Sequence, residues 1–272
     1  MLESFMEFTK FYSSAISKYR VHSPFVTDVI EEVIYGSKVP SNQERLEDIR
    51  QTFLQNHRKI SLSTLGAPSR VSGSATRSIR QIAKSSLTPR SQAELLFRIV
   101  DYFRPTTMLE LGTCLGVTSL YQYAGNQHAI FHTVEGDPET FAEAKKLFES
   151  IQHPGLKAIQ GRFADVLPSL LQNLKKVDYA FIDGDHTGEG LRRYLKILLP
   201  YIHDSSVIVL HDIHWSSDMA KAWCELRKYP DIKVSIDLFY LGLLFFRKEI
   251  DEPIHINLVS HWYKPWQNGF FH

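Results

Sequence analysis

Residues 108–118 read Met-Leu-Glu-Leu-Gly-Thr-Cys-Leu-Gly-Val-Thr, and this stretch decides the fold. A short apolar strand runs into an acid, Glu110, and then into two glycines, Gly112 and Gly116, before a helix starts. A dinucleotide-binding turn would instead read G-x-G-x-x-G and place a pyrophosphate at the helix N-terminus. The glycines still allow a tight turn and close backbone approach. The added carboxylate predicts a ligand with a cationic end.

The chain after this stretch alternates between short apolar runs and helical stretches such as 138–150 and 189–199. Near-continuous apolar strands alternating with amphipathic helices predict a parallel sheet that is covered on both faces. The predicted parallel strands are residues 107–111, 130–135, 156–160, 178–182 and 207–210.

The end of this alternation has a different pattern. Residues 234–239 and 241–247 read as strands but leave no room for a crossover helix between them. Parallel strands need a crossover of a dozen residues or more, so these two are predicted to form an antiparallel hairpin at the end of the sheet. Gly242 is the predicted site of a close backbone approach or a bulge.

Length and composition set ordinary bounds. The 272 residues fit one α/β domain with an extension, and a net charge of +1 offers no general attraction to nucleic acid or to an anionic membrane. Two cysteines, Cys114 and Cys224, are too few for a disulfide framework. No apolar run approaches the length of a membrane span, and the first residues do not resemble a signal peptide. We therefore expect a soluble cytoplasmic protein without a membrane partner.

Three regions precede or follow the alternating part. Residues 1–56 show helical periodicity, and a second helix is expected after His22-Ser23-Pro24, because proline is favoured in a first turn. Residues 57–93 contain seven Lys or Arg, no Asp or Glu, and twelve Ser or Thr, which predicts a mobile or conditionally ordered segment. The predicted domains are a helical extension (1–56), a basic linker or lid (57–92), the main domain (93–250) and a C-terminal tail (251–272).

Polar residues follow the second and third predicted strands, where ligands of open α/β sheets bind. Glu135 lies 25 residues beyond Glu110, at the spacing of the acid that accepts ribose hydroxyls after a dinucleotide turn. The alternative is that Glu135 is a solvent-exposed carboxylate that caps the next helix. Asp165 follows the third strand and either borders the ligand or caps the helix expected at 166–174.

The fourth and fifth strands end in Asp183-Gly184-Asp185-His186 and His211-Asp212-Ile213-His214. Two carboxylates from adjacent strand ends, Asp183 and Asp212, can share one small pocket. His186 is a candidate base, since imidazole titrates near neutrality; its alternative role is to cap a helix that begins near Thr187. Cys114 is expected to pack beside the ligand rather than act as a nucleophile.

Together these motifs resemble the class I S-adenosylmethionine-dependent methyltransferases over residues 90–248. The similarity is greatest to the O-methyltransferase-like group related to catechol O-methyltransferase, whose fourth strand reads Phe-Ile-Asp-Gly-Asp-His and whose fifth ends in His-Asp. The resemblance implies a Rossmann-like, doubly wound α/β sheet of seven strands in the order 3-2-1-4-5-7-6, the last antiparallel. Residues 20–25 and 79–84 resemble an extension of uncharacterised bacterial members.

The resemblance also implies ligands. S-adenosylmethionine would be bound by Glu110, Gly112, Thr113, Gly116, Glu135, Asp165 and Asp183. Asp183 and Asp212 fall on positions that hold a divalent cation, for which magnesium is preferred. Ile213 stands where those enzymes have asparagine, so the third ligand would come from His211, His214, Asp185 or substrate, or the metal would be softer. The alternative is that both acids act through hydrogen bonds alone.

The predicted function is methyl transfer to an oxygen of a small molecule, with Asp183 and His186 as catalytic residues. The basic segment favours an anionic acceptor. The sequence leaves two other functions open. One is a nucleic-acid methyltransferase, which the near-neutral net charge disfavours, and the other is a non-catalytic scaffold that binds the cofactor. A homodimer is left open. The nucleic-acid alternative would use Arg70, Arg77, Arg80, Lys84 and Arg90 against phosphates.

Overall fold

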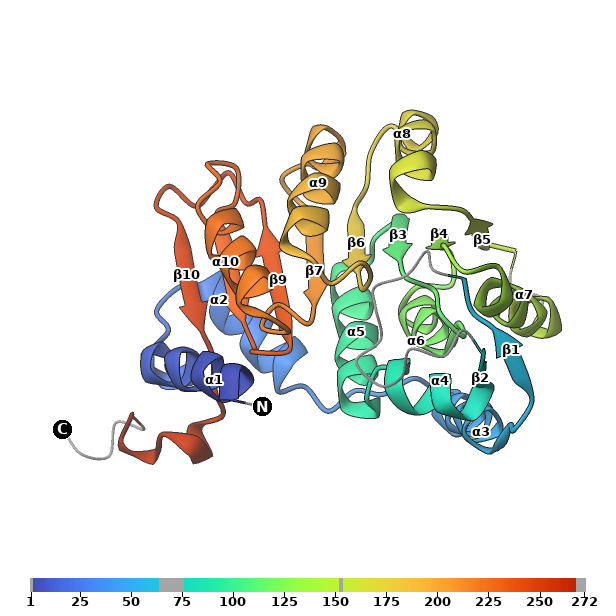
Figure 1. The fold of residues 1–272 in the computed structure, drawn as a ribbon. Coiled ribbons are helices and arrows are strands. Elements are labelled where there is room, and N and C mark those ends of the chain that lie inside the picture. The colour runs from blue at the N-terminus through green and yellow to red at the C-terminus, as the bar shows by residue number, and fades with distance from the viewer. Residues whose placement is uncertain (1, 64–75, 152–153, 268–272) are drawn as a thin grey trace. The chain divides into compact units, whose positions relative to one another are not determined.

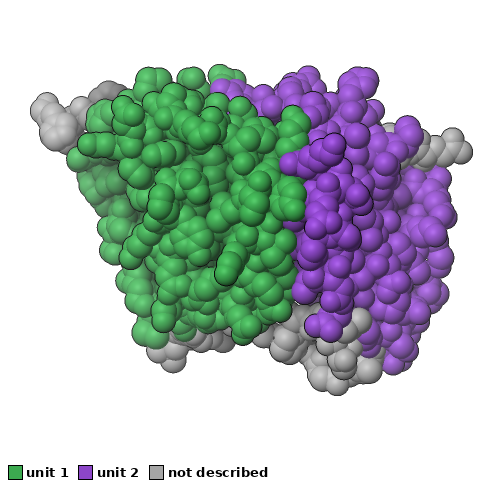
Figure 2. Space-filling model, turned by 90° about the horizontal axis from the view of Figure 1, so that it is seen from above, with its two compact units in different colours: residues 1–35, 176–272 green, residues 36–175 purple. Residues whose placement is uncertain are grey.

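The computed structural model describes residues 2–63, 76–151 and 154–267. The chain forms two compact units (Figure 2): residues 36–175 make one, and residues 1–35 together with 176–272 make the other. We call them the central unit and the terminal unit, and Figure 1 labels their helices and strands.

The central unit is built on three parallel strands. β4 lies between β3 and β5, with Glu110 opposite Thr133 and Glu135 opposite Gln160. A two-stranded antiparallel hairpin, β1 with β2, belongs to the same unit. Its strands are β1 (Lys59–Ser61), β2 (Thr76–Ser78), β3 (Thr107–Leu111), β4 (Ile130–Glu135) and β5 (Leu156–Gln160), and its helices are α3 (Gln43–Gln55), α4 (Ile79–Ser86), α5 (Arg90–Phe103), α6 (Val117–Gly125), α7 (Pro138–Ile151) and α8 (Phe163–Leu174).

The terminal unit holds five strands in the order β6-β7-β9-β8-β10. β6 and β7 are parallel, β9 runs antiparallel to both β7 and β8, and β10 is parallel to β8. Its strands are β6 (Tyr179–Ile182), β7 (Val207–His211), β8 (Val234–Asp237), β9 (Leu241–Phe245) and β10 (Ile254–Asn257). Its helices are α1 (Leu2–Ser14), α2 (Pro24–Asp28), the π-helical turn Val29–Ile34, α9 (Gly188–Leu198) and α10 (Ser217–Leu226), with short 3₁₀ turns at Lys18–Arg20, Leu199–Tyr201, His261–Tyr263 and Pro265–Gln267.

This α/β architecture of mainly parallel strands confirms the predicted Rossmann-like class, and each unit has its expected strand order. The antiparallel hairpin is confirmed, and a Cβ on Gly242 would lie 2.8 Å from the Trp223 ring, which explains the glycine. The hairpin is not the end of the sheet, because β10 adds a parallel strand outside β8. The alternating Ile-His-Ile-Asn of this short strand carries little signal in sequence.

The basic segment is more structured than its composition predicts. The described parts, 57–63 and 76–92, contain the hairpin, α4 and the start of α5. Ser78 and Gln81 form a capping box at the start of α4. Ile60, Ile79 and Ile82 pack with Leu115 in one buried cluster, so a few apolar residues fix a segment that charge and polarity predict to be mobile. Residues 64–75 of the predicted linker or lid (57–92) lie outside the described residues.

The first and last segments of the chain are joined within the terminal unit. Ser23 caps α2 and accepts a hydrogen bond from the Val26 N–H at 3.5 Å, as the proline position predicts. Ile16 pairs with Leu258, directly after β10. The Lys264 ammonium donates to the Ala15 carbonyl at 2.6 Å, so the end of α1 and the C-terminal segment pack as one piece.

Candidate functional site

The loop after β3, residues 112–116, is a strained turn; we call it the glycine loop. Gly112 and Gly116 have φ of 108° and 81°, and Cys114 also has a positive φ, 49°. A Cβ on Gly116 would lie 2.8 Å from the Phe148 ring of α7. Both the backbone angle and the close contact therefore require glycine at 116. Figure 1 shows α6 following directly from this loop, as the motif predicts.

Glu110 does not face the loop's open side. Its side chain has no exposed surface. Ser119 and Thr133 donate hydroxyl hydrogen bonds to Oε2, and Gln122 donates its amide to Oε1 at 2.6 Å. Direct contact of Glu110 with the cofactor stays a prediction. Glu110 ties β3 to α6 and β4, and so holds the glycine loop at its base.

Glu135, the last residue of β4, lies beside the glycine loop. It is partly exposed, and its two oxygens accept hydrogen bonds from the N–H groups of Cys114 and Asp137, each at 2.8 Å. Burial raises the pKa of Glu135, and these N–H groups oppose that rise. The carboxylate joins the glycine loop to the strand end and keeps lone pairs for ribose hydroxyls. Its alternative, a helix cap, is taken by Asp137, whose Oδ1 accepts from the Thr140 N–H at 2.9 Å.

Two further predicted contacts lie in the central unit. Thr113 bonds through its hydroxyl to the Thr133 hydroxyl, so this side chain is used within the protein, and any ligand contact falls to the backbone. Asp165 lies inside the first turn of α8, not at its N-cap, because the helix begins three residues earlier than expected. Its side chain is 68% exposed and lies 3.8 Å from the Arg162 guanidinium, so it is available at the end of β5.

A second set of polar residues follows β6 and β7 in the terminal unit; we call Asp183, His186, His211 and Asp212 the strand-end cluster. His211 Nδ1 lies 2.9 Å from Asp183 Oδ1 and 3.6 Å from Asp212 Oδ2. His186 presents Nε2 to Asp183 at 3.8 Å and Nδ1 to Asp212 at 3.9 Å. All four side chains are mostly buried but reach solvent. Two carboxylates and two imidazoles are thus brought together as the strand ends predict.

The cluster shifts the acidity of its members. Burial alone would raise the pKa of Asp183, but the charge and hydrogen bond of His211, with the charge of His186, hold it below the ordinary value. Burial alone would lower the pKa of His211, but the charges of Asp183 and Asp212 raise it to about 9. Near neutral pH the pair is therefore a carboxylate and an imidazolium.

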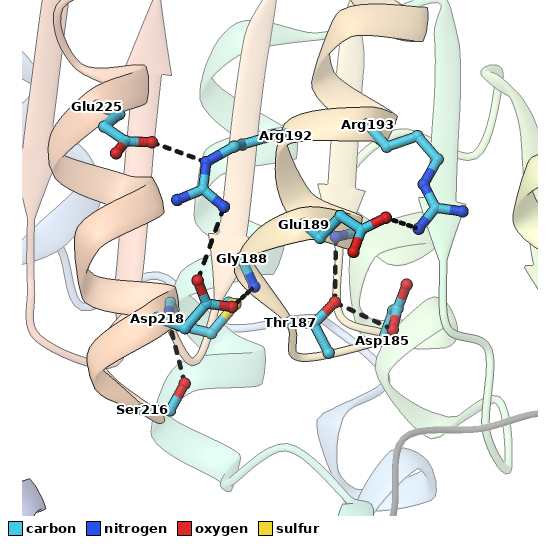
Figure 3. A network of polar contacts seen from close by, with 11 residues as sticks. Asp185, Thr187, Gly188, Glu189, Arg192, Arg193, Ser216, Asp218 and Glu225 are labelled. Atoms are coloured by element: carbon cyan, nitrogen blue, oxygen red, sulfur yellow. Dashed lines mark hydrogen bonds and ion pairs between the residues drawn. The ribbon is translucent and has the colours of Figure 1, made fainter.

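Left-handed backbone is concentrated beside this cluster. Asp185, His186 and Asp212 have φ of 66°, 26° and 54°, and such angles in non-glycine residues mark sites where geometry is held against local preference. His186 does not cap α9, because the Thr187 hydroxyl accepts from the Gly190 N–H at 3.0 Å and performs that role (Figure 3). The His186 imidazole is thus left to the cluster.

The network in Figure 3 shows what fixes the start of α9. The Asp218 carboxylate of α10 accepts from the Gly188 N–H at 2.6 Å and lies 3.7 Å from the Arg192 guanidinium. Arg192 also donates to Glu225 at 2.7 Å. These contacts tie α9 to α10, and so hold the loop that carries Asp183 and His186.

The residues do not fit the predicted divalent cation. Magnesium takes oxygen ligands at about 2.0–2.1 Å, but here a nitrogen of His211 faces both carboxylates. His186 turns a different nitrogen to each acid and could offer only one to an ion. Ile213 is fully buried and has no donor atom. In the described parts of the chain, no three His, Cys, Asp or Glu side chains are arranged to hold a metal ion.

The proposed replacement ligands are directed elsewhere. His214 Nε2 lies 2.9 Å from Asp237, which also accepts from the Trp223 indole at 2.7 Å. Asp185 accepts from the Tyr194 hydroxyl at 2.7 Å. In sequence, His211 is predicted only as a replacement metal ligand, and its pairing with Asp183 is not predicted. The pairing could have been inferred, because residues at the ends of two adjacent parallel strands lie side by side.

The sequence over residues 109–213 matches a family model described as a methyltransferase domain. No curated protein sequence matches this chain. The matched residues run from β3, through the glycine loop and Glu135, to the strand-end cluster.

Solved structures of methyltransferases share the fold. An O-methyltransferase from Bacillus cereus in complex with SAH is 14% identical, with a TM-score of 0.53, over 81% of this chain and 97% of that one. The O-methyltransferase TomG from Streptomyces achromogenes, in complex with SAM, is 15% identical, with a TM-score of 0.52, over 75% and 98%. SAH-bound PaMTH1 from Podospora anserina is 18% identical, with a TM-score of 0.51, over 78% and 100%.

The match to a methyltransferase domain over residues 109–213 and the fold shared with solved methyltransferases agree with the resemblance of the motifs. Among the described residues, no helix has the length and apolar character needed to cross a membrane.

Proposed function

We propose that this protein transfers the methyl group of S-adenosylmethionine to a hydroxyl oxygen of a small molecule. The proposal assigns cofactor binding to Glu135 and the glycine loop, and proton removal from the acceptor to the strand-end cluster. The observation that carries it is the arrangement of His186, whose two ring nitrogens lie 3.8 and 3.9 Å from Asp183 and Asp212.

The residues at β3 and β4 suit the cofactor. The strained glycine loop brings backbone close to a ligand, and Glu135 keeps acceptor capacity for two ribose hydroxyls. Asp165, mostly exposed at the start of α8, is assigned to the adenine side, as the resemblance implies. S-adenosylmethionine supplies the methyl group: its carbon bonds to the acceptor oxygen while its bond to sulfur breaks and the electron pair stays on sulfur.

The strand-end cluster, after β6 and β7, removes the proton from the acceptor hydroxyl. His186 accepts the hydroxyl proton as the oxygen attacks, and the positive charge it gains is stabilised by Asp183 and Asp212. Release of that proton to water returns the imidazole to its starting state. A positioned base contributes about 10²–10⁴-fold to such a step. Asp183, which the sequence predicts as a catalytic residue, acts in this scheme by holding negative charge beside the base.

The acceptor is proposed to be small. Three of the basic residues expected to meet phosphates have partners within the chain: the buried Arg77 donates to the Ser85 hydroxyl at 2.9 Å, and on the surface Arg90 pairs with Glu94 at 2.8 Å and Arg80 lies 3.3 Å from His57. These contacts disfavour the nucleic-acid alternative. An anionic acceptor, proposed from the basic composition of residues 57–93, remains part of the proposal.

The test measures methyl transfer from isotopically labelled S-adenosylmethionine to a panel of phenols, catechols and hydroxy acids. Transfer by the wild type, and its loss in His186→Ala with unchanged cofactor affinity, is the expected result. Calorimetric binding of NAD in place of S-adenosylmethionine would contradict the cofactor assignment. Labelling of RNA in preference to every small acceptor would favour the nucleic-acid alternative.

A further inference from the structure

We infer that the imidazole of His211 takes the place of a divalent cation between Asp183 and Asp212, so that the strand-end cluster works without a metal ion. The inference rests on the proposed function for its chemistry. Its geometry comes from side chains of the terminal unit alone.

The position of His211 follows from strand register. Ile182 pairs with Leu210 in the parallel ladder of β6 and β7, so the next residues, Asp183 and His211, emerge side by side. Their atoms Oδ1 and Nδ1 are 2.9 Å apart. The ring is also packed edge-on to Phe181, with centroids 6.1 Å apart. His211 is therefore held in place by β7, by an acid and by an aromatic ring.

The position of the His211 ring makes His211 and a cation alternatives. Its Nδ1 lies 2.9 Å from Asp183 and 3.6 Å from Asp212, so it occupies the space between the two carboxylates. A hard dication prefers oxygen ligands and would have to displace this ring to contact both acids. Ile213, the residue after Asp212, is fully buried and has no donor atom to offer an ion.

The same arrangement performs the work that a metal would do. A metal clamp stabilises a substrate oxygen as its proton leaves. Here the proton passes to His186, and the two acids that flank its nitrogens stabilise the charge. His211 is a positioning residue in this scheme, because it sets the orientation of Asp183 and Asp212 and does not itself take the proton.

The experiment titrates Mg²⁺, Mn²⁺ and Zn²⁺ into the wild-type protein by calorimetry, and Mn²⁺ by electron paramagnetic resonance. We expect no stoichiometric binding to the wild type. His211→Gln removes the ring that lies between the two carboxylates, so the affinity of this variant for a divalent ion should rise by about tenfold or more. The matched control is His203→Gln. His203 precedes β7 and pairs at 2.8 Å with Asp178, which precedes β6, so this variant removes a similar pair at the other end of the same strands. That variant should bind ions as the wild type does.

One stoichiometric divalent ion on the wild type, with binding lost in Asp183→Asn, would overturn the inference. Methyl transfer that stops on exhaustive chelation and returns with Mg²⁺ would also overturn it while leaving the proposed function intact. If His211→Gln does not fold, the wild-type titration decides alone. That titration needs no acceptor, so it supports or overturns the inference even where no methyl transfer is found.

Discussion

The carboxylates at the strand ends of the two units are held by different kinds of partner. In the central unit, Glu135 is held by backbone N–H groups and Glu110 by hydroxyls and an amide. In the terminal unit, Asp183 and Asp212 are held by imidazoles. Neutral donors fix the position of a carboxylate but do not take up a proton, whereas an imidazole can gain or lose one. The first arrangement suits binding, and the second suits proton transfer.

The largest effect is expected from removing the exchangeable group. His186→Ala should lower kcat by about 10²–10⁴-fold, because the acceptor then loses its positioned base. Cofactor affinity, measured by calorimetry, should stay within a few-fold of the wild type, since the acids and N–H groups of the central unit are untouched.

His203→Ala is the control for this variant, since it removes an imidazole that pairs with an acid at the other end of the same strands. Equal losses of turnover in the two variants would show that His186 acts through stability. Added imidazole should restore part of the turnover of His186→Ala and none in the control.

The variant Glu135→Ala tests the acid of the central unit that is held by backbone N–H groups. The loss of charge-assisted hydrogen bonds to ribose hydroxyls should weaken S-adenosylmethionine binding by about 1.5–3 kcal/mol, or about 10- to 150-fold. Glu139→Ala, an exposed acid in the first turn of α7, should leave the affinity unchanged. A folded Glu135→Ala protein with wild-type affinity would remove the ribose assignment.

Strands β3, β4 and β5 could be predicted because each is a short, largely apolar run between helical stretches, and their bounds agree with the predicted ranges. Strand β10 could not, because its residues alternate between apolar and polar. The partner of a side chain at a strand end could not be predicted either. The partner of Glu110, Thr133, is supplied by the neighbouring strand. The pairing of His211 with Asp183 likewise depends on the register of β6 against β7.

The variant Glu110→Gln tests whether Glu110 supports the fold while Glu135 binds the cofactor. The amide that replaces the carboxylate would present its N–H₂ to groups that now donate, so some buried donors would lose their acceptor. We expect a loss of about 1–3 kcal/mol in the free energy of unfolding, measured by urea denaturation. Cofactor affinity per folded molecule should change less than in Glu135→Ala. A stable Glu110→Gln protein that no longer binds S-adenosylmethionine would return Glu110 to the binding role.

The last expected effect is a dependence of stability on pH between 6.5 and 9, which follows from the raised pKa of His211 in the imidazole-held cluster. Because the pKa of His211 is raised from 6.5 to about 9, the folded protein keeps a proton that the unfolded chain releases. Its contribution to stability is full below pH 6.5 and is lost as the pH rises through 9. The lowered pKa of Asp183 adds stability above its ordinary value of 3.8 that is lost at lower pH. Stability measured from pH 6.5 to 9 should therefore fall in the wild type, and the fall should be smaller in His211→Gln. The same slope in both proteins would mean that His211 is not protonated in the folded state, and the contrast between the two regions would then lie in their geometry alone.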